Sequence, residues 1–132
     1  MKVLIDTPIW SLVLRRRNPD AAVISELSSL MEDDRIAIIG PIRQELLSGA
    51  KDKVQFERLR NELHDFPDTE IASSDYEEAA SFSNECRRHG IQGSHIDFLI
   101  CAVAVRNDFP IFTTDGDFAH FARVLPITLY DS

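Results

Sequence analysis

The chain has 132 residues, the size of one ordinary domain, and we expect a single domain over residues 1–132. Its hydrophobic content of 44% is sufficient for a buried core and excludes a disordered chain. Its net charge of −8 argues against a nucleic-acid-binding protein with a broad basic surface, unless bound divalent cations offset several of the negative charges.

The first half of the chain alternates short apolar runs with helical patterns. Residues 2–6 (KVLID) predict a buried strand, and the following segment predicts a helix in which Thr7 is a suitable N-cap and Pro8 fits the first helical position. The next expected elements are a helix over 21–34, a strand over 35–39, a helix over 40–50 and a charged helix over 51–66.

The second half continues the alternation. We expect a helix over 73–90 that Ser or Asp begins, a helix over 94–108 so apolar that it must be buried, a strand over 109–114, a short helix over 117–124 and a final strand or tail over 126–132. Strands that alternate with helices predict an α/β fold with a central, mainly parallel sheet flanked by helices.

The sequence also indicates where in the cell the protein is expected. No apolar stretch approaches the roughly 18 residues that a membrane span needs. The N-terminal run reaches an acid at Asp6, so it does not resemble a signal peptide. Two cysteines, Cys86 and Cys101, cannot build a disulfide scaffold, and we expect a cytoplasmic protein with no membrane association.

Five acids stand where strands end or where the helices next to them begin. Asp6 follows the first strand, Glu45 lies one turn into the helix after the second, Asp97 is in the first turn of the buried helix, and Asp115 and Asp117 follow a later strand. Each acid also has an ordinary structural explanation. These are a favourable helix dipole for Asp6, a solvated helix surface for Glu45, a capping box with Ser94 for Asp97, and an Asp-Gly turn for the last pair.

The coincidence of all five is more informative than any one of them. In parallel α/β folds, ligands bind outside the carboxyl ends of the strands, so these acids would face one edge of the sheet. Two carboxylates about 5 Å apart repel by roughly 3 kcal/mol at an effective dielectric near 20, so a cluster of them has raised pKa values or binds cations. A ligand set made only of oxygen favours Mg²⁺ or Mn²⁺ over Zn²⁺ and suits phosphodiester hydrolysis.

The segments "VLIDTPIWSLVLRR", "IRQELLSG", "GSHIDFLICAVA" and "IFTTDGDF" together resemble the PIN domain family, and specifically VapC-type toxin ribonucleases of toxin–antitoxin pairs. The resemblance covers essentially the whole chain. It implies an endoribonuclease that uses Mg²⁺ (or Mn²⁺), a homodimer, and a cognate antitoxin protein that inserts a segment near the active site. The residues it implies are catalytic Asp6, Glu45, Asp97 and Asp115, metal-binding Asp6, Asp97, Asp115 and Asp117, and supporting Thr7 and Thr113.

The RNA-binding surface is not fixed by these motifs. We expect Arg15, Arg16 and Arg43 to contact RNA phosphates, and the first two belong to a run of three arginines that ends at Arg17.

Three other functions are compatible with parts of the pattern. A phosphatase of the haloacid-dehalogenase type needs a second Asp two residues after the first, where this chain has Pro8. Such a phosphatase and a phospho-accepting receiver domain both need a late Lys, and no Lys follows Lys53. A PIN-like module that binds partners without cleaving RNA would carry the same fold, and only a nuclease assay separates it from the enzyme.

Overall fold

A computed structural model describes residues 1–14 and 20–131. Within them the chain forms three strands and seven helices. In chain order they are β1 (Val3–Ile5), α1 (Thr7–Leu14), α2 (Ala21–Glu32), β2 (Ile36–Ala37), α3 (Gly40–Ser48), α4 (Lys53–Leu63), α5 (Ser73–Arg88), α6 (His95–Asn107), β3 (Ile111–Phe112) and α7 (Asp117–Phe121). None of the helices in the described residues is long and apolar enough to cross a membrane.

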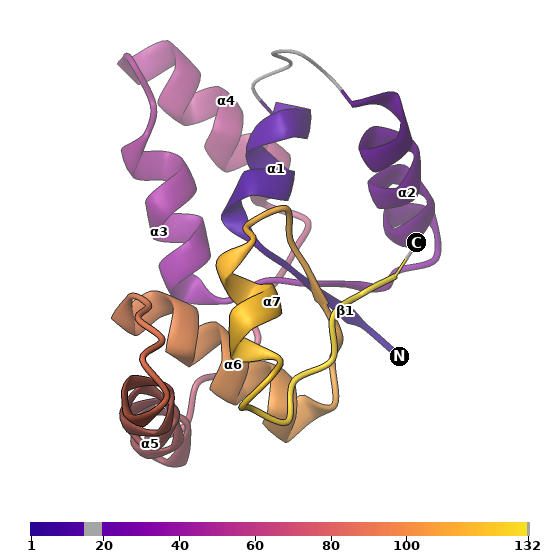
Figure 1. Ribbon diagram of the computed structural model, residues 1–132. Helices are drawn as coiled ribbons and strands as arrows, with labels where there is room; N and C mark the ends of the chain where they lie inside the picture. Colours follow the sequence, from indigo (N-terminus) through magenta and orange to yellow (C-terminus); the bar gives the residue numbers. More distant parts are fainter. Residues whose placement is uncertain (15–19, 132) are drawn as a thin grey trace.

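The three strands form one parallel sheet in the order β2-β1-β3. Leu4 of the central strand is opposite Ala37 on one side and Ile111 on the other. In Figure 1, α1 and α4 lie above the strands and α5 and α6 lie below them, so the sheet passes between two groups of helices. The predicted α/β class with a parallel sheet flanked by helices is therefore confirmed.

The core forms where the helices cover the sheet. All three residues of β1 have no exposed surface, as expected for a central parallel strand with both faces covered. In α6 every residue from Phe98 to Ala104 is buried, because this helix is apolar on all sides and lies inside the molecule. Phe118 and Phe121 of α7 are fully buried as well, and they fix this short helix against the rest of the core.

One helix start differs from the sequence prediction. Thr7 is the first residue of α1 and not its N-cap; Asp6 holds that place, since its carbonyl accepts hydrogen bonds from the backbone N–H groups of Ile9 and Trp10. Helix α5 begins at Ser73 as predicted, and its first-turn acid Asp75 accepts a 2.8 Å hydrogen bond from the backbone N–H of Ala72. The C-terminal segment, predicted as a strand or tail, makes a single parallel bridge from Leu129 to Ile111.

Candidate metal centre

The carboxyl ends of the strands place four acids at one edge of the sheet. Asp6 is the residue directly after β1, and Thr113 directly follows the neighbouring β3. Asp115 and Asp117 come next in the turn that leads into α7, and Asp97 lies in the first turn of α6. The parallel pairing of β1 with β3 brings the segments that follow these two strands together at this edge.

Asp6 is the most buried of these acids, with 5% of its surface exposed. Its Oδ1 accepts a 2.8 Å hydrogen bond from the backbone N–H of Thr7, and its Oδ2 accepts one of 2.8 Å from Oγ1 of Thr113. Burial raises the pKa of Asp6, the bonds from Thr113 and Thr7 oppose that rise, and the charges of Asp97 and Asp115 add to it. The carboxylate is thus fixed in one orientation but carries unfavourable charge.

The segment after β3 continues this hydrogen-bonded chain. Oγ1 of Thr113 accepts a 2.9 Å hydrogen bond from the backbone N–H of Asp115. Oδ1 of Asp115 in turn accepts one of 2.9 Å from the backbone N–H of Asp117. The turn therefore connects the buried Asp6 to the exposed Asp117 through Thr113 and Asp115, and it holds both late acids at defined positions.

Asp97 reaches the same place from the start of α6. The predicted capping box is confirmed: Oγ of Ser94 accepts a 3.0 Å bond from the backbone N–H of Asp97, and Oδ2 of Asp97 accepts a 3.1 Å bond from the backbone N–H of Ser94. Burial raises the pKa of Asp97. The hydrogen bonds from Ser94 lower this pKa in part, and the negative charges of Asp115 and Asp117 raise it.

Asp97, Asp115 and Asp117 form a compact group. One carboxylate oxygen from each lies within 4.8 Å of the others. Two oxygens bound to the same Mg²⁺ at about 2.1 Å are separated by at most roughly 4.2 Å, so small side-chain rotations bring this group to a coordinating arrangement. The donors are all carboxylate oxygens, and their mutual repulsion is of the kind that a divalent cation relieves. The residues therefore fit a hard divalent metal ion, with Asp6 beside the group.

Glu45 is placed differently from the four aspartates. It lies on the exposed surface of α3, and its side chain makes no hydrogen bond or ion pair with any residue that the structure describes. The structure does not bring it into the compact group of three acids. Thr7 is near the site through its backbone N–H, which bonds to Asp6.

Of the three arginines expected to contact RNA, the structure describes only Arg43. Arg43 is directed into the protein: its Nε pairs with Oδ1 of Asp68 at 2.9 Å, and its two terminal nitrogens donate to the carbonyl oxygens of Leu63 and Phe66. This network gives Arg43 a structural role in closing the segment after α4, and its contact with RNA remains a prediction. Arg15 and Arg16 lie outside the described residues.

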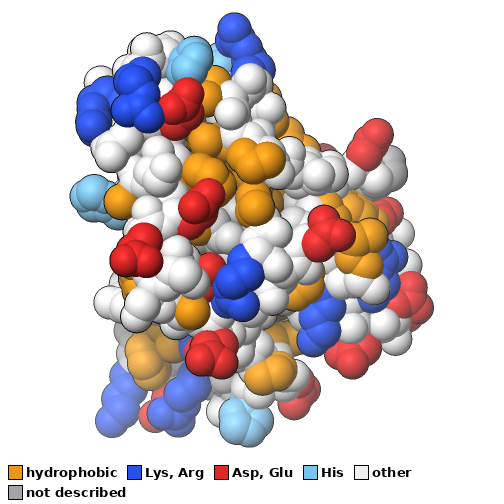
Figure 2. All heavy atoms as spheres, turned by 90° about the horizontal axis from the view of Figure 1, so that it is seen from below, with side chains coloured by type: hydrophobic (Ala, Val, Ile, Leu, Met, Phe, Trp, Pro, Cys, Tyr) orange, Lys and Arg blue, Asp and Glu red, His pale blue; other side chains and the backbone are white. Residues whose placement is uncertain are grey.

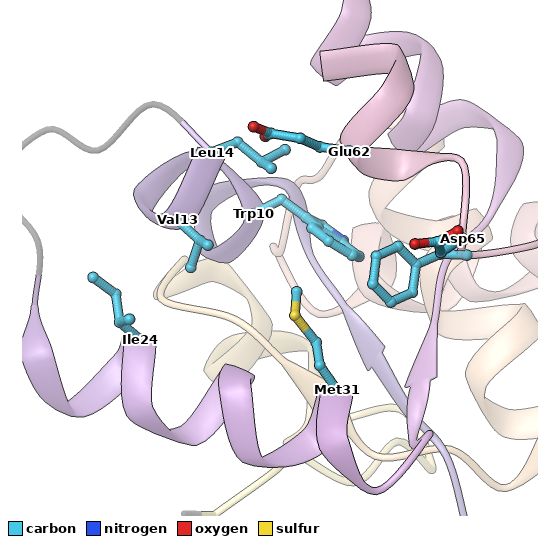
Figure 3. Close-up of a pocket in the computed structure, with 8 residues that line it drawn as sticks. Trp10, Val13, Leu14, Ile24, Met31, Glu62 and Asp65 are labelled. Atoms are coloured by element: carbon cyan, nitrogen blue, oxygen red, sulfur yellow. The ribbon is translucent and has the colours of Figure 1, made fainter. Parts of the chain in front are cut away.

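A second feature, which the sequence analysis missed, is an apolar pocket of about 670 Å³ between α1, α2 and the end of α4. Figure 3 shows Trp10 and Val13 of α1 facing Met31 of α2 across this pocket, with Glu62 and Asp65 beside it. Trp10 is fully buried, yet its indole Nε1 has no hydrogen-bond partner among the described residues. Such an orphaned donor is uncommon in the interior of a protein.

Comparison with known proteins agrees with this geometry. The family model described as PIN domain matches residues 3–124. The chain is 34% identical over 126 residues to "VapC ribonuclease Mb1587" of Mycobacterium bovis and equally to "Ribonuclease VapC11" of Mycobacterium tuberculosis, with 92% of each chain covered.

Solved structures show the same fold at lower identity. A crystal structure of VapBC2 from Rickettsia felis, bound to a DNA fragment from its promoter, has a chain with a TM-score of 0.82 at 20% identity, over 100% of this chain and 99% of that one. A chain of VapBC-1 from nontypeable Haemophilus influenzae gives a TM-score of 0.77 at 16% identity, over 99% and 98%.

Proposed function

This chain belongs to the PIN domain family, in its VapC group, and from that premise we propose that it is a metal-dependent endoribonuclease and the toxin of a toxin–antitoxin pair. The observation that carries the proposal is the group of three carboxylates within 4.8 Å of one another, next to the buried Asp6. Relatives named as ribonucleases support RNA as the substrate. The cytoplasm, where RNA is made and translated, is the corresponding location.

We assign the metal to Asp6, Asp97, Asp115 and Asp117, and we take Mg²⁺ or Mn²⁺ as the ion because the donors are all carboxylate oxygens. The chemistry that such an ion supplies is polarisation of a phosphodiester and a lowered pKa of water. The chain itself supplies position. Asp6 is oriented by Thr7 and Thr113, and Asp97 is oriented by Ser94, before any substrate arrives.

Glu45 is the residue whose role is least determined by its contacts. We propose that it orients the attacking water or binds the metal through a water molecule, since α3 begins at the same edge of the sheet as the aspartates. Its exposed carboxylate, free of described partners, is available for either role. We do not assign Glu45 as a direct metal ligand, because it is outside the group formed by Asp97, Asp115 and Asp117.

The proposal is tested by an RNA-cleavage assay on the purified chain with and without EDTA. We expect cleavage in Mg²⁺, none in EDTA, and a loss of at least roughly 100-fold in the Asp97→Asn variant. Asp108→Asn is the matched control, because Asp108 is at the opposite end of α6. A wild-type chain that never cleaves RNA in the presence of metal, while still binding a partner, would identify it as a silent binding module.

Growth of bacteria that produce the chain alone provides an independent test. The wild-type chain should slow growth, and the Asp97→Ala form should not. Equal growth of the two strains would argue against the toxin assignment, even if the purified protein cleaves RNA.

We further propose that the apolar pocket at Trp10 binds the antitoxin. Its lining offers apolar side chains, Val13, Ile24 and Met31 among them, to an apolar segment of the partner. The exposed Asp65, which also lines the pocket, is suited to a partner Lys or Arg, whereas Glu62 pairs with Arg58 at 3.2 Å. The relatives solved as VapBC complexes support a protein partner of this kind.

A homodimer is the last part of the proposal. It is supported by the family to which the chain belongs and by the exposed ring of Tyr76, 57% of which is accessible on α5 beside an apolar pocket shared with α6. Light scattering on the purified chain measures the assembly directly, and a monomer at all concentrations would remove this part.

A further inference from the structure

We propose that a second, polar cavity beside the acids binds a backbone phosphate of the RNA next to the one that is cleaved, with Arg123 as its positioning residue. The cavity has a volume of about 360 Å³ and lies between α7 and the turn that follows α5. The inference rests on the proposed ribonuclease activity and adds to it the place where the substrate backbone lies.

The cavity is continuous with the metal centre. Asp117 belongs to the group of three carboxylates and also lines this cavity, so the two share one wall. His120 and Arg123, which follow Asp117 in the same segment, line it as well. An extended polymer that places one phosphate at the acids can therefore extend a neighbouring phosphate into the cavity.

Among the arginines that the structure describes, Arg123 is unusual because its guanidinium has no hydrogen bond or ion pair. Hydrogen bonds or ion pairs engage the guanidinium groups of Arg35, Arg43, Arg58, Arg87, Arg88 and Arg106. Arg123 is exposed, and its guanidinium has no such bond with any residue that the structure describes. In the described part of the chain only Arg60 shares this property, and it lies on α4 and does not line the cavity.

The position of Arg123 is fixed by the backbone that carries it. Its backbone N–H donates to the carbonyl of His120 at 3.1 Å, and the turn around it is held by Phe118 and Phe121, both fully buried. Phe121 packs against Phe98 of α6 with ring centroids 5.0 Å apart. Residues three apart on a helical turn are neighbours on its surface, so His120 and Arg123 lie near each other at the cavity.

The opposite wall is equally well defined. It consists of His89, Gly90, Ile91 and Gln92 from the turn after α5. Gly90 has a φ of 74°, and the backbone N–H groups of Gly90 and Ile91 donate back to Arg87 and Cys86 at 3.0 and 2.9 Å. No other group lies within 4 Å of the point where a side chain on Gly90 would begin, so this wall is open to a ligand.

Electrostatics favours a phosphate as the occupant. The chain carries a net charge of −8, and the substrate is a polyanion that must approach a group of carboxylates. On the face shown in Figure 2, basic and acidic side chains are interspersed, without one large continuous area of blue. A single unpaired guanidinium beside the metal centre is therefore a strong local determinant of where the backbone lies, since arginine binds phosphate oxygens with two parallel hydrogen bonds.

The experiment uses a labelled RNA transcript that the wild-type chain cleaves in Mg²⁺. We would measure kcat and KM over a series of NaCl concentrations for four proteins. These are the wild type, Arg123→Gln, Arg123→Lys and the matched control Arg60→Gln. Arg123→Gln should raise KM about tenfold and leave kcat within about twofold, because the lost contact positions the substrate and does not touch the reacting atoms. It should also reduce the slope of log KM against log salt concentration by about 0.7, the value for one phosphate contact on a single strand.

The control variants distinguish a loss of the Arg123 contact from a general loss of positive charge and from a loss of stability. Arg60→Gln removes the same charge elsewhere and should match the wild type. Arg123→Lys should restore the salt slope, because it keeps the charge, but only part of the affinity, because it loses the paired hydrogen bonds. The unfolding temperature should change little, since the exposed Arg123 side chain has no hydrogen bond or ion pair with any described residue to lose. Equal KM and salt slope in Arg123→Gln and Arg60→Gln would overturn the inference, as would a loss confined to kcat. A wild-type chain that cleaves no RNA would instead refute the proposed function.

Discussion

Oγ1 of Thr113 donates a 2.8 Å hydrogen bond to Oδ2 of Asp6, although the two residues are 107 positions apart in the sequence. The same oxygen accepts the backbone N–H of Asp115 at 2.9 Å. One hydroxyl thus connects the ends of two adjacent parallel strands and sets the position of two acids relative to each other.

Replacing Thr113 by Val should therefore weaken both fold and activity. The change keeps the shape but removes both hydrogen bonds, which should cost about 1–3 kcal/mol in the free energy of unfolding measured in urea. Cleavage should fall about tenfold or more as Asp6 and Asp115 lose their relative position. Thr113→Ser retains the hydroxyl and should restore both properties, and Thr114→Val, on the exposed neighbour, is the control. A Thr113→Val enzyme with wild-type rate would show that the bridge has no catalytic importance.

Asp6→Asn should abolish cleavage and yet stabilise the metal-free protein at neutral pH. Burial and the acidic neighbours raise the pKa of Asp6 in the folded protein. Protonation of Asp6 therefore stabilises the fold fully below its ordinary pKa of about 3.9, and this stabilisation is lost as the pH rises through the raised pKa. Asn is neutral throughout. In EDTA the variant should unfold roughly 3 °C above the wild type at pH 7, and the difference should vanish toward pH 3.

The same measurement has two internal checks. Mg²⁺ should raise the unfolding temperature of the wild type more than that of Asp6→Asn, because the ion binds only the folded state and the variant has one ligand fewer. Asp108→Asn should match the wild type both in its unfolding temperature in EDTA and in the rise that Mg²⁺ causes. A variant whose advantage grows as the pH falls would contradict the sign derived from burial.

Glu45→Gln tests how this exposed acid takes part. If Glu45 orients water, kcat should fall about 100-fold while the affinity for Mn²⁺, measured by calorimetry, stays within about twofold. Glu57→Gln, an exposed acid on α4, is the matched control. An unchanged kcat would remove Glu45 from the catalytic set, and a large loss of Mn²⁺ affinity would identify it as a ligand.

Asp65→Arg tests the pocket at Trp10. The substitution reverses a charge on the rim, so the dissociation constant for the antitoxin should rise about tenfold while cleavage by the free chain is unchanged. Glu57→Arg makes the same charge reversal away from the pocket and should have little effect. Equal antitoxin binding by both variants would place the partner on another surface.

The sequence was sufficient to predict the fold class and the edge at which the aspartates lie. Asp6 and Asp115 follow adjacent parallel strands, and the carboxyl ends of such strands share one edge, so their convergence follows from the alternation of elements alone. The capping box at Ser94 and Asp97 was predictable because it is local, with both partners in one helical turn.

What the sequence could not show depends on contacts between distant segments. Arg43 is used by Asp68 and by two carbonyl groups after α4, and no local pattern places that loop beside α3. The orphaned Nε1 of Trp10 is likewise a property of how three helices close around it. Strand lengths were overestimated for a related reason: apolar runs continue beyond the paired residues because burial extends further than the ladder of hydrogen bonds.

The order of the sheet bears on when a newly made chain becomes active. The central strand β1 is synthesised before its neighbour β3, which leads to Asp115 and Asp117. A chain that terminates before β3 therefore carries Asp6 without the carboxylates of those two residues, and we expect it to bind no metal at this edge.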